Sequence, residues 1–565
     1  MLRQNWLLQS TLLILTALLL MNLPWFPVSV IGGVLLLILL PGMQIVRWLG
    51  LWTGWRHLYS VILSLAFGVS IVPLLIFWTG WLEGLSKISI SLTLVLATTI
   101  GALFNHYFPL SSQKLPRGVK KIPPIVIGTS AIIVLSIILA YLEPRTDAGS
   151  YPVEMGDWIK HHGVAWSLRE TGIPPKNIFF AGPEPDSPLT YYYFTHLNVA
   201  ALDWLSNNPI NINTAFIIIA ILSAFSFIFS VHLLSQELFG PKAANLTVLF
   251  VTLIGGGDII PTFHRLWQKY PDATWFNLIL TSTEHIDNWT PTQNLRISVF
   301  ITHFLWVPQH ITALLIVILG LYIYRLEISS KRLIPILALL VAALPGHSIW
   351  LSLTVFPALL LYALYHLWIT RYTAGWRPAI RLLNGYTLIA GGALLIILPF
   401  MLTLLKTAPG QAGITFNLPD HLNSWPLLSP FQGWFPNNVL AKLLDVLIHY
   451  FIEMGALLVA GLSGWWQFFR THTSAKSKPS LFPILTLFLV IGFGLITFFA
   501  SGRAYADMGL ILNNDLSLRA IMPAQLTLAL FAGNYTAQLQ YKKNWLPTVI
   551  IGSLMLIGLA SALWE

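Results

Sequence analysis

The sequence contains no cysteine and very little charge. Without cysteine, disulfides, thiolate nucleophiles and cysteine metal sites are all excluded. Only 9% of the 565 residues are charged and 56% are hydrophobic, whereas soluble domains carry about 25% charged residues. Also missing are the phosphate-binding pattern GxxxxGK[ST] and the zinc-protease pattern HExxH, so primary active transport and zinc proteolysis lose support. The composition is that of an integral membrane protein.

Apolar segments long enough to cross a membrane recur along the whole chain. The first follows Arg3 as a signal peptide would, but a second apolar run begins at Phe26 with no cleavage site between them, so we expect the first to remain as a span. The fold class predicted is all-α, a polytopic transmembrane helical bundle of about fifteen spans. These are expected at 5–24, 27–46, 58–80, 88–108, 123–142, 213–236, 243–262, 310–325, 333–348, 350–369, 383–404, 443–467, 481–500, 516–537 and 546–563.

The distribution of basic residues predicts the orientation. With the N-terminus in the cytoplasm, 19 of the 31 basic residues and only two of the 21 acids fall in inside segments, as the positive-inside rule requires. If the apolar segment Leu189–Leu205 crossed the membrane, every later loop would lie on the opposite side, against that rule. We therefore expect this segment along the outer interface. The net charge of +10 is then an orientation signal, and no nucleic-acid partner is expected.

The first four spans end in the basic stretch QKLPRGVKK, so residues 1–122 are predicted to form an N-terminal accessory bundle and 123–565 the core. Four long loops of the core are expected outside the membrane. They are rich in Trp, Tyr, Pro, Asn and His, which favours ordered interfacial structure. The loops are 143–212, 263–309, 405–442 and 501–515.

A helix with acids near its start is predicted in the first outer loop. Gly156 opens the helix, and a Thr-Gly-Ile-Pro-Pro stop follows Glu170. Asp157 and His161 fall at i, i+4 on one face, where a carboxylate and an imidazole can activate a hydroxyl, bind a metal or recognise a sugar. Asp157 can equally cap the helix, and the nearby Asp147 and Glu154 can belong to a solvated rim.

Three consecutive tyrosines, Tyr191, Tyr192 and Tyr193, come next, followed by His196. On a helix they cannot share one face, because successive residues are about 100° apart, but Tyr192 and His196 can. Aromatic faces with hydroxyls suit binding of a sugar or a lipid headgroup. The alternative is an interfacial aromatic belt without further function.

A third polar stretch, RISVFITHFLWVPQH, runs from Arg296 to His310. His303, Trp306 and His310 would form one helical stripe entering the membrane, next to Gln309. Ionisable groups at that depth normally face a cavity or a partner. Pro308 should break the helix there and free backbone groups that need polar surroundings.

Late in the chain, Asp515 and Arg519 are spaced i, i+4 at the outer end of a span, and Arg503 lies shortly before them. The plainest interpretation is an intrahelical ion pair. Alternatively, Arg519 meets a phosphate, which a guanidinium binds bidentately. Asp445 and Glu453 lie within another span, where they can serve as bundle contacts.

The order of these motifs resembles a known family. The pattern D-x3-H, G-I-P-P, Y-Y-Y-F-x-H and V-P-Q-H is similar to the polytopic membrane proteins named for a triple-tyrosine (YYY) motif, and more broadly to the C-type glycosyltransferases (GT-C), which use polyprenyl-phosphate sugars. That resemblance implies an all-helical membrane fold, a catalytic or metal-binding acid in the first long outer loop, and a late basic residue on the lipid phosphate. Here the acid would be Asp157, Glu154 or Asp147, and the basic residue Arg519 or Arg503. In many relatives the acid follows the first span, whereas four more spans precede that unit here.

We therefore predict an inverting glycosyltransferase at the outer face of a prokaryotic plasma (inner) membrane. Its expected partners are membrane lipids, a polyprenyl-phosphate sugar donor and a glycan, lipid or protein acceptor. A divalent ion, Mg or Mn, is the cofactor that the resemblance allows. Two alternatives remain open: a secondary transporter or flippase for a lipid-linked glycan, and a non-catalytic protein of envelope assembly.

Overall fold

The computed structural model describes most of the chain as helices. The described residues are 6–52, 58–108, 122–141, 145–146, 149–150, 156–178, 188–206, 211–272, 274, 297–326, 328–407, 414–416, 439–472, 480–501, 516–539 and 545–564. They divide into two compact units. Unit 1 comprises residues 1–230, 304–349 and 363–409, and unit 2 comprises 231–303, 350–362 and 410–565. The boundary predicted at residue 122 remains a prediction.

Eleven helices among the described residues are long and apolar enough to cross a membrane. Three shorter apolar helices, Trp6–Met21, Pro124–Ala140 and Phe482–Phe498, coincide with three more of the expected spans. The protein is thus an all-α polytopic membrane protein, as its composition predicts. The expected span 243–262 corresponds to two helices separated by residues 253–258, and the expected span 443–467 lies in a helix that is kinked at Gly455.

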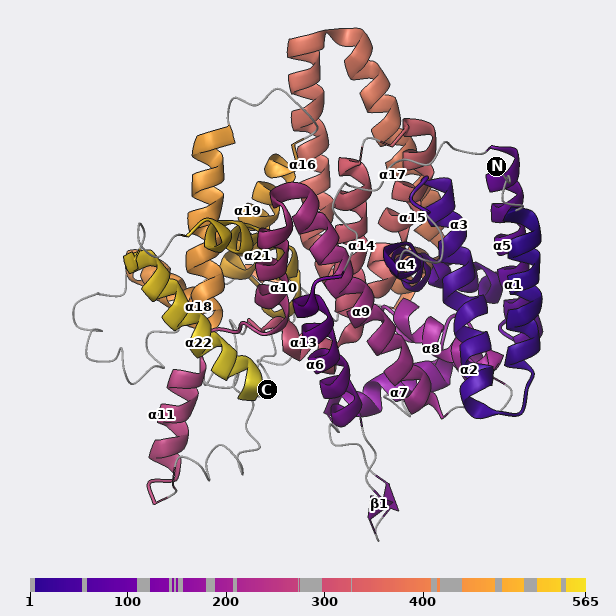
Figure 1. Ribbon diagram of the computed structural model, residues 1–565, viewed down its shortest axis with the longest axis horizontal. Coiled ribbons are helices and arrows are strands. Elements are labelled where there is room, and N and C mark those ends of the chain that lie inside the picture. The colour runs from indigo at the N-terminus through magenta and orange to yellow at the C-terminus, as the bar shows by residue number, and fades with distance from the viewer. Residues whose placement is uncertain are drawn as a thin grey trace. The chain divides into compact units, whose positions relative to one another are not determined.

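In unit 1, the N-terminal helices pack on one another (Figure 1, indigo). Helix α3 contacts both α4 and α5, and α1 lies against α2 and α5. A short π-helical turn, Leu35–Leu39, joins α2 to α3 without interruption. The bounds are α1 Trp6–Met21, α2 Phe26–Val34, α3 Leu40–Trp48, α4 Leu58–Glu83 and α5 Lys87–Tyr107.

The remaining elements of unit 1 carry the polar motifs. A small antiparallel pair, β1 (Arg145–Thr146) and β2 (Gly149–Ser150), lies between α6 and α7. Helices α16 and α17 are joined at Gly375, which has a positive φ (Figure 1). The helices are α6 Pro124–Ala140, α7 Gly156–Thr171, α8 Phe194–Leu205, α9 Ile212–Phe239, α14 Pro308–Arg325, α15 Ser330–His347, α16 Ile349–Ala374 and α17 Trp376–Thr407; α9 continues into unit 2, and α16 has residues of both units.

Unit 2 is built around α21, which packs against α10, α18 and α19. Its one described strand pair, β3 (Ile414–Phe416) with β4 (Phe499–Ser501), connects two of the expected outer-loop regions. A π-helical turn, Leu516–Ala520, precedes α21. The helices are α10 Pro241–Thr252, α11 Ile259–Lys269, α13 Phe300–Trp306, whose last residues belong to unit 1, α18 Val439–His472, α19 Phe482–Phe498, α21 Met522–Gln538 and α22 Trp545–Trp564.

The continuous helix expected at 243–262 is interrupted, because three glycines end the first part of it. After Thr252 the chain leaves the helical path, and Gly255 and Gly257 donate their N–H groups to Gly558 and Ile452. Ile452 can accept because α18 is kinked at Gly455 (φ 43°, ψ −115°). A Cβ at Gly256 would lie 2.2 Å from the carbonyl oxygen of Glu453, so only glycine permits this approach.

The helix in the segment Leu189–Leu205 is too short to cross a membrane. Helix α8 has 12 residues, about 18 Å by helical rise. The sequence predicts this segment along the outer interface. In the structure, α8 is buried among α2, α4, α5, α7, α14 and α15, because its polar side chains find partners inside unit 1.

A methyl group at Gly256 should destabilise the protein. The substitution Gly256→Ala pushes Cβ into the Glu453 carbonyl, and overpacking of this kind costs about 1–3 kcal/mol. We expect a lower apparent melting temperature in detergent. Gly257→Ala is the matched control, because its Cβ would have its nearest neighbour at 3.6 Å. Equal effects of the two substitutions would contradict this account.

Candidate functional site

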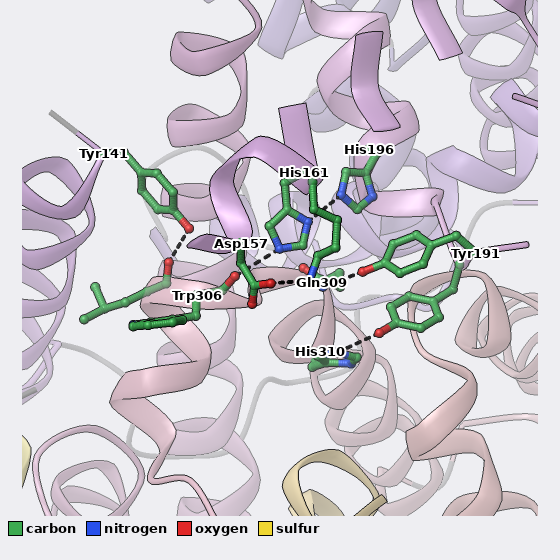
Figure 2. A network of polar contacts seen from close by, with 11 residues as sticks. Tyr141, Asp157, His161, Tyr191, His196, Trp306, Gln309 and His310 are labelled. Atoms are coloured by element: carbon green, nitrogen blue, oxygen red, sulfur yellow. Dashed lines mark hydrogen bonds and ion pairs between the residues drawn. The ribbon is translucent and has the colours of Figure 1, made fainter. Parts of the chain in front are cut away.

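A break between α13 and α14 organises the polar part of unit 1. Val307 leaves the helical conformation (φ −141°, ψ 58°), and Pro308 has no N–H to donate. The carbonyls of Leu305 and Trp306 therefore need other donors. The Tyr141 hydroxyl donates to the Leu305 carbonyl, and His161 Nε2 lies 3.0 Å from the Trp306 carbonyl (Figure 2). The break predicted at Pro308 is confirmed, and side chains satisfy the carbonyls that it frees.

His161 and His196 form a buried imidazole pair. Their rings stack at 5.1 Å, and His161 Nδ1 lies 2.9 Å from His196 Nε2. Because a carbonyl can only accept, His161 Nε2 carries a proton. Burial, followed by the charges of His161 and Lys160, holds the pKa of His196 well below its usual value. A neutral His196 then donates from Nε2 to Nδ1 of His161, so both nitrogens of His161 are engaged.

The three tyrosines separate into two groups. Tyr191 and Tyr192 stack at 4.3 Å, and their hydroxyls lie 3.4 Å from Gln309 Nε2 and 3.2 Å from His310 Nε2. Tyr193 is buried against Phe400 instead, and burial raises the pKa of its hydroxyl.

The expected pairing of Tyr192 with His196 on one helical face does not occur. Helix α8 begins only at Phe194, so the tyrosines precede it. The ring that approaches His196 is that of Tyr191, at 5.9 Å.

Two further histidines link α14 and α15 to this region. His310 Nδ1 lies 2.8 Å from the Ser348 hydroxyl, while its Nε2 faces Tyr192. His347 lies between the Thr195 hydroxyl (2.8 Å) and the Ser70 carbonyl (3.1 Å). All of these partners are buried, so each hydrogen bond forms away from water, where an unpaired group costs most.

Asp157 lies in the first turn of α7, one helical turn before His161. Its carboxylate pairs with Lys160 on the same helix. The side chains of Asp157 and Lys160 are 31% and 24% exposed, whereas His161 is fully buried. The shared helical face therefore has an accessible end, with a carboxylate and an ammonium, and a buried end fixed by the imidazole pair.

A second charged contact fixes the other end of α7. Arg169 Nη1 lies 3.0 Å from the buried carboxylate of Asp203 on α8. Burial raises the pKa of Asp203 to about 6, although Arg169 acts in the opposite direction. Helix α7 is thus held to α8 at both ends, by His161 and by Arg169.

The structure brings several of the predicted site residues together in unit 1: Asp157, His161, Tyr191, Tyr192, His196, Gln309 and His310. Other candidates lie outside the described residues: Asp147, Glu154, Arg503 and Asp515. The described part of the chain contains no group of three or more His, Asp or Glu residues that could hold a metal ion. A metal site at Asp157 would need Asp147 or Glu154 as a further ligand. Because both lie outside the described residues, the metal site remains a prediction.

His303 and Arg519 are buried in unit 2. The expected helical stripe of His303, Trp306 and His310 is wrong, because the break at Val307 separates His310 from the first two. Unit 2 also contains Glu453, whose carboxylate faces His449 at 3.3 Å and accepts from the Ile297 N–H. The side chain of Asp445 lies outside the described residues.

Comparison with known proteins adds a distant structural likeness. No protein-family model matches the chain, and no curated protein sequence matches it. Among solved structures it is similar to the archaeal oligosaccharyltransferase AglB from Archaeoglobus fulgidus, in complex with an inhibitory peptide and a dolichol-phosphate. The TM-score is 0.31 with 12% identity, over 78% of this chain and about half (53%) of that one. Likeness at this level does not transfer an activity, so function has to be argued from the site.

Sequence reasoning missed four contributors: Tyr141, Lys160, His347 and Ser348. Lys160 could have been found, because it follows Asp157 at i, i+3 on the expected helix. Nothing in the neighbouring sequence points to Tyr141, His347 or Ser348. Their partners lie more than 30 residues away in the sequence, and only the packing of α8 and α14 brings them together.

Removing the Tyr141 hydroxyl should weaken unit 1. Tyr141→Phe leaves the buried Leu305 carbonyl without this donor, and a buried acceptor without its partner costs about 1–3 kcal/mol. The expected result is a lower apparent melting temperature. Tyr372→Phe is the control, because Tyr372 is 84% exposed. An unchanged melting temperature in Tyr141→Phe would show that the break needs no such donor.

The raised pKa of Asp203 predicts a pH-dependent effect. Between the unfolded pKa of 3.8 and the folded value of about 6, the folded state binds the extra proton, so this group stabilises at low pH and its contribution is lost as pH rises. Asp203→Asn should therefore lose stability relative to wild type as pH falls from 7 to 5, by about 1 kcal/mol per unit below pH 6. Melting curves of both proteins across that range measure the difference.

The nearby His162 acts in the opposite direction. Burial lowers its pKa to about 4, so its contribution is lost as pH falls. Because His162 is present in both proteins, only the difference between wild type and Asp203→Asn isolates Asp203. Glu83→Gln serves as control, since Glu83 is an exposed carboxylate, whereas Glu170 itself helps to raise the pKa of Asp203. A difference that does not change with pH would contradict the assignment.

Proposed function

We propose that this protein is a membrane glycosyltransferase that uses a lipid-phosphate sugar as donor. The Asp157 carboxylate accepts the proton of an acceptor hydroxyl. The hydroxyl oxygen forms a bond to the anomeric carbon, and the bond from that carbon to the phosphate oxygen breaks with its electrons on the phosphate. Attack from the opposite side inverts the anomeric centre.

The observation that supports this proposal most directly is the accessible carboxylate at the start of α7. A general base has to be reachable by its substrate and held in one position. Asp157 meets the first requirement with a side chain that is 31% exposed. The hydrogen bonds that His161 accepts from His196 and donates to the Trp306 carbonyl support the second, because they anchor the next turn of α7. His161 is therefore proposed as a positioning residue.

The substrate-binding surface is proposed along Tyr191, Tyr192, Gln309 and His310. Stacked tyrosines present aromatic faces to sugar rings, and the amide and imidazole can hydrogen-bond to hydroxyls. His196 supports this surface through its contact with Tyr191. Tyr193 and His303 are buried elsewhere and are assigned to packing.

Lys160 is proposed to orient the Asp157 carboxylate, because the two side chains form an ion pair. The departing phosphate leaves from the opposite face of the sugar, and Arg519 and Arg503 are the residues that the family resemblance suggests there. A divalent ion, when bound, would supply further positive charge. Among the described residues only Asp157 is placed to contribute a carboxylate ligand to such an ion, with Asp147 and Glu154 as the predicted remainder.

The test is complementation of cells that lack the gene. Wild type and Glu170→Gln, an exposed control on the same helix, should restore the glycan, whereas Asp157→Asn should not. Loss of a general base reduces the rate by about 10²–10⁴-fold. Mass spectrometry of lipids and glycans should show an accumulated polyprenyl-phosphate sugar and a shortened glycan. Full activity of Asp157→Asn at equal membrane level would refute the assignment.

A second candidate function is transport of a lipid-linked glycan. Unit 2 contains two interrupted helical regions in contact, at Gly455 in α18 and at Gly255–Gly257 after α10, and broken helices often form the substrate sites of secondary transporters. In the same cells, loss of a transporter would leave a complete lipid-linked glycan on the inner leaflet. Loss of a transferase would leave an incomplete one.

A further inference from the structure

A buried arginine at the end of the first long span has no ion-pair partner among the described residues. Arg47 lies in the last turn of α3, at the end of the span Phe26–Trp48, and is only 7% exposed. Its guanidinium lies over the ring of Trp6, 4.4 Å from the centroid, and 5.2 Å from that of Trp52. Aromatic rings attract the cation but offer no acceptor in the guanidinium plane.

One edge of the Arg47 guanidinium has no hydrogen-bond acceptor among the described residues. Nη1 donates to the Ser10 hydroxyl at 3.0 Å, and Gln44 donates to the same oxygen at 3.2 Å. Nε and Nη2 are buried and meet no acceptor within the described part of the chain. These two nitrogens form the side-on fork with which arginine binds an oxyanion bidentately.

The backbone carbonyls at the end of α3 do not accept hydrogen bonds from Nε and Nη2 of Arg47. At the end of α3, the carbonyls of Ile45, Val46 and Arg47 already accept from Leu49, Leu51 and Gly50. The Trp48 carbonyl accepts from Arg332, which also reaches the Phe108 carbonyl. Arg332 therefore donates two hydrogen bonds to carbonyls at helix ends, whereas Nε and Nη2 of Arg47 have no such acceptor.

No acid of the described residues is paired with Arg47. Residues 1–142 contain a single acid, Glu83, against eight Lys and Arg residues. Gly42 of α3 packs on Ser64 and Gly68 of α4, and Ser60 bonds to Leu51, so the end of α3 lies by the start of α4. Glu83 is the last residue of α4, about 30 Å further along that helix. A buried charge without a paired anion costs several kcal/mol, so an anion from outside the chain would stabilise Arg47.

We propose that Arg47 binds a phosphate group, that of an anionic phospholipid headgroup, in a site closed by Trp6, Trp52 and Ser10. The end of a span is the depth at which headgroup phosphates lie. The fork of Nε and Nη2 matches two phosphate oxygens, and the surrounding tryptophans keep water away from the contact. This site gives the N-terminal helices a lipid-binding role that does not depend on the proposed transferase activity.

The test uses the full-length protein in detergent with short-chain phosphatidylglycerol as probe. Native mass spectrometry and melting curves should show a lipid bound to wild type that raises its melting temperature. Arg47→Gln should bind at least about tenfold more weakly, because charge-assisted hydrogen bonds are lost. Arg47→Lys, which keeps the charge without the fork, should also lose binding. Arg371→Gln is the matched control, because Arg371 also lies over a tryptophan, Trp376 at 3.9 Å, but is exposed.

Inorganic phosphate provides the second arm. If millimolar phosphate produces the same Arg47-dependent stabilisation and displaces the lipid, the site is a phosphate site with a soluble source. If phosphatidylglycerol alone does so, the source is the membrane. The proposal is overturned if both probes act equally on wild type, Arg47→Gln and Arg47→Lys, or if neither binds to wild type. Should Arg47→Gln fail to fold, the Lys variant makes the same distinction.

Discussion

Buried polar groups need partners, and this requirement determines how unit 1 is assembled. Helix α8 is enclosed by protein, yet it carries Thr195, His196, Asn198 and Asp203. Each of these finds a partner on a different element: His347 of α15, His161 of α7, the Val69 carbonyl of α4 and Arg169 of α7. Since each unmade bond would cost about 1–3 kcal/mol, the positions of α4, α7 and α15 around α8 are strongly specified.

The same requirement connects the fold to the proposed chemistry. The break at Val307 frees two carbonyls, and one of them accepts from His161. This bond holds α7 where its accessible first turn, with Asp157 and Lys160, ends beside the polar contacts of α8 and α14. A buried pair of imidazoles thus supports a partly exposed ion pair, and rigid support of this kind is what a general base requires.

Much of the architecture could be predicted from local features of the sequence. Apolar length identified nearly all spans, and Pro308 marked the break because proline cannot donate. The predictions that the structure corrects share one cause. A local sequence pattern does not show which residues, distant in the sequence, will contact it in the fold. The expected span at 243–262 contains three glycines. Their role depends on the Glu453 carbonyl, which is distant in the sequence and approaches Gly256 closely where the helix is interrupted. Likewise, Tyr192 was assigned to a helical face because nothing local places the start of α8 at Phe194.

By itself, the sequence determined that this is an all-helical membrane protein without cysteine chemistry, and it identified Asp157, His161, the tyrosines and His310 as residues worth attention. These conclusions rest on composition and short spacings, which are properties of neighbouring residues. The packing of the helices shows that His161 is a buried support, that Tyr193 belongs to the core, and that Arg47 is buried without an ion-pair partner among the described residues. Burial and hydrogen-bond partners depend on residues far apart in the chain, so they exist only once the helices have packed.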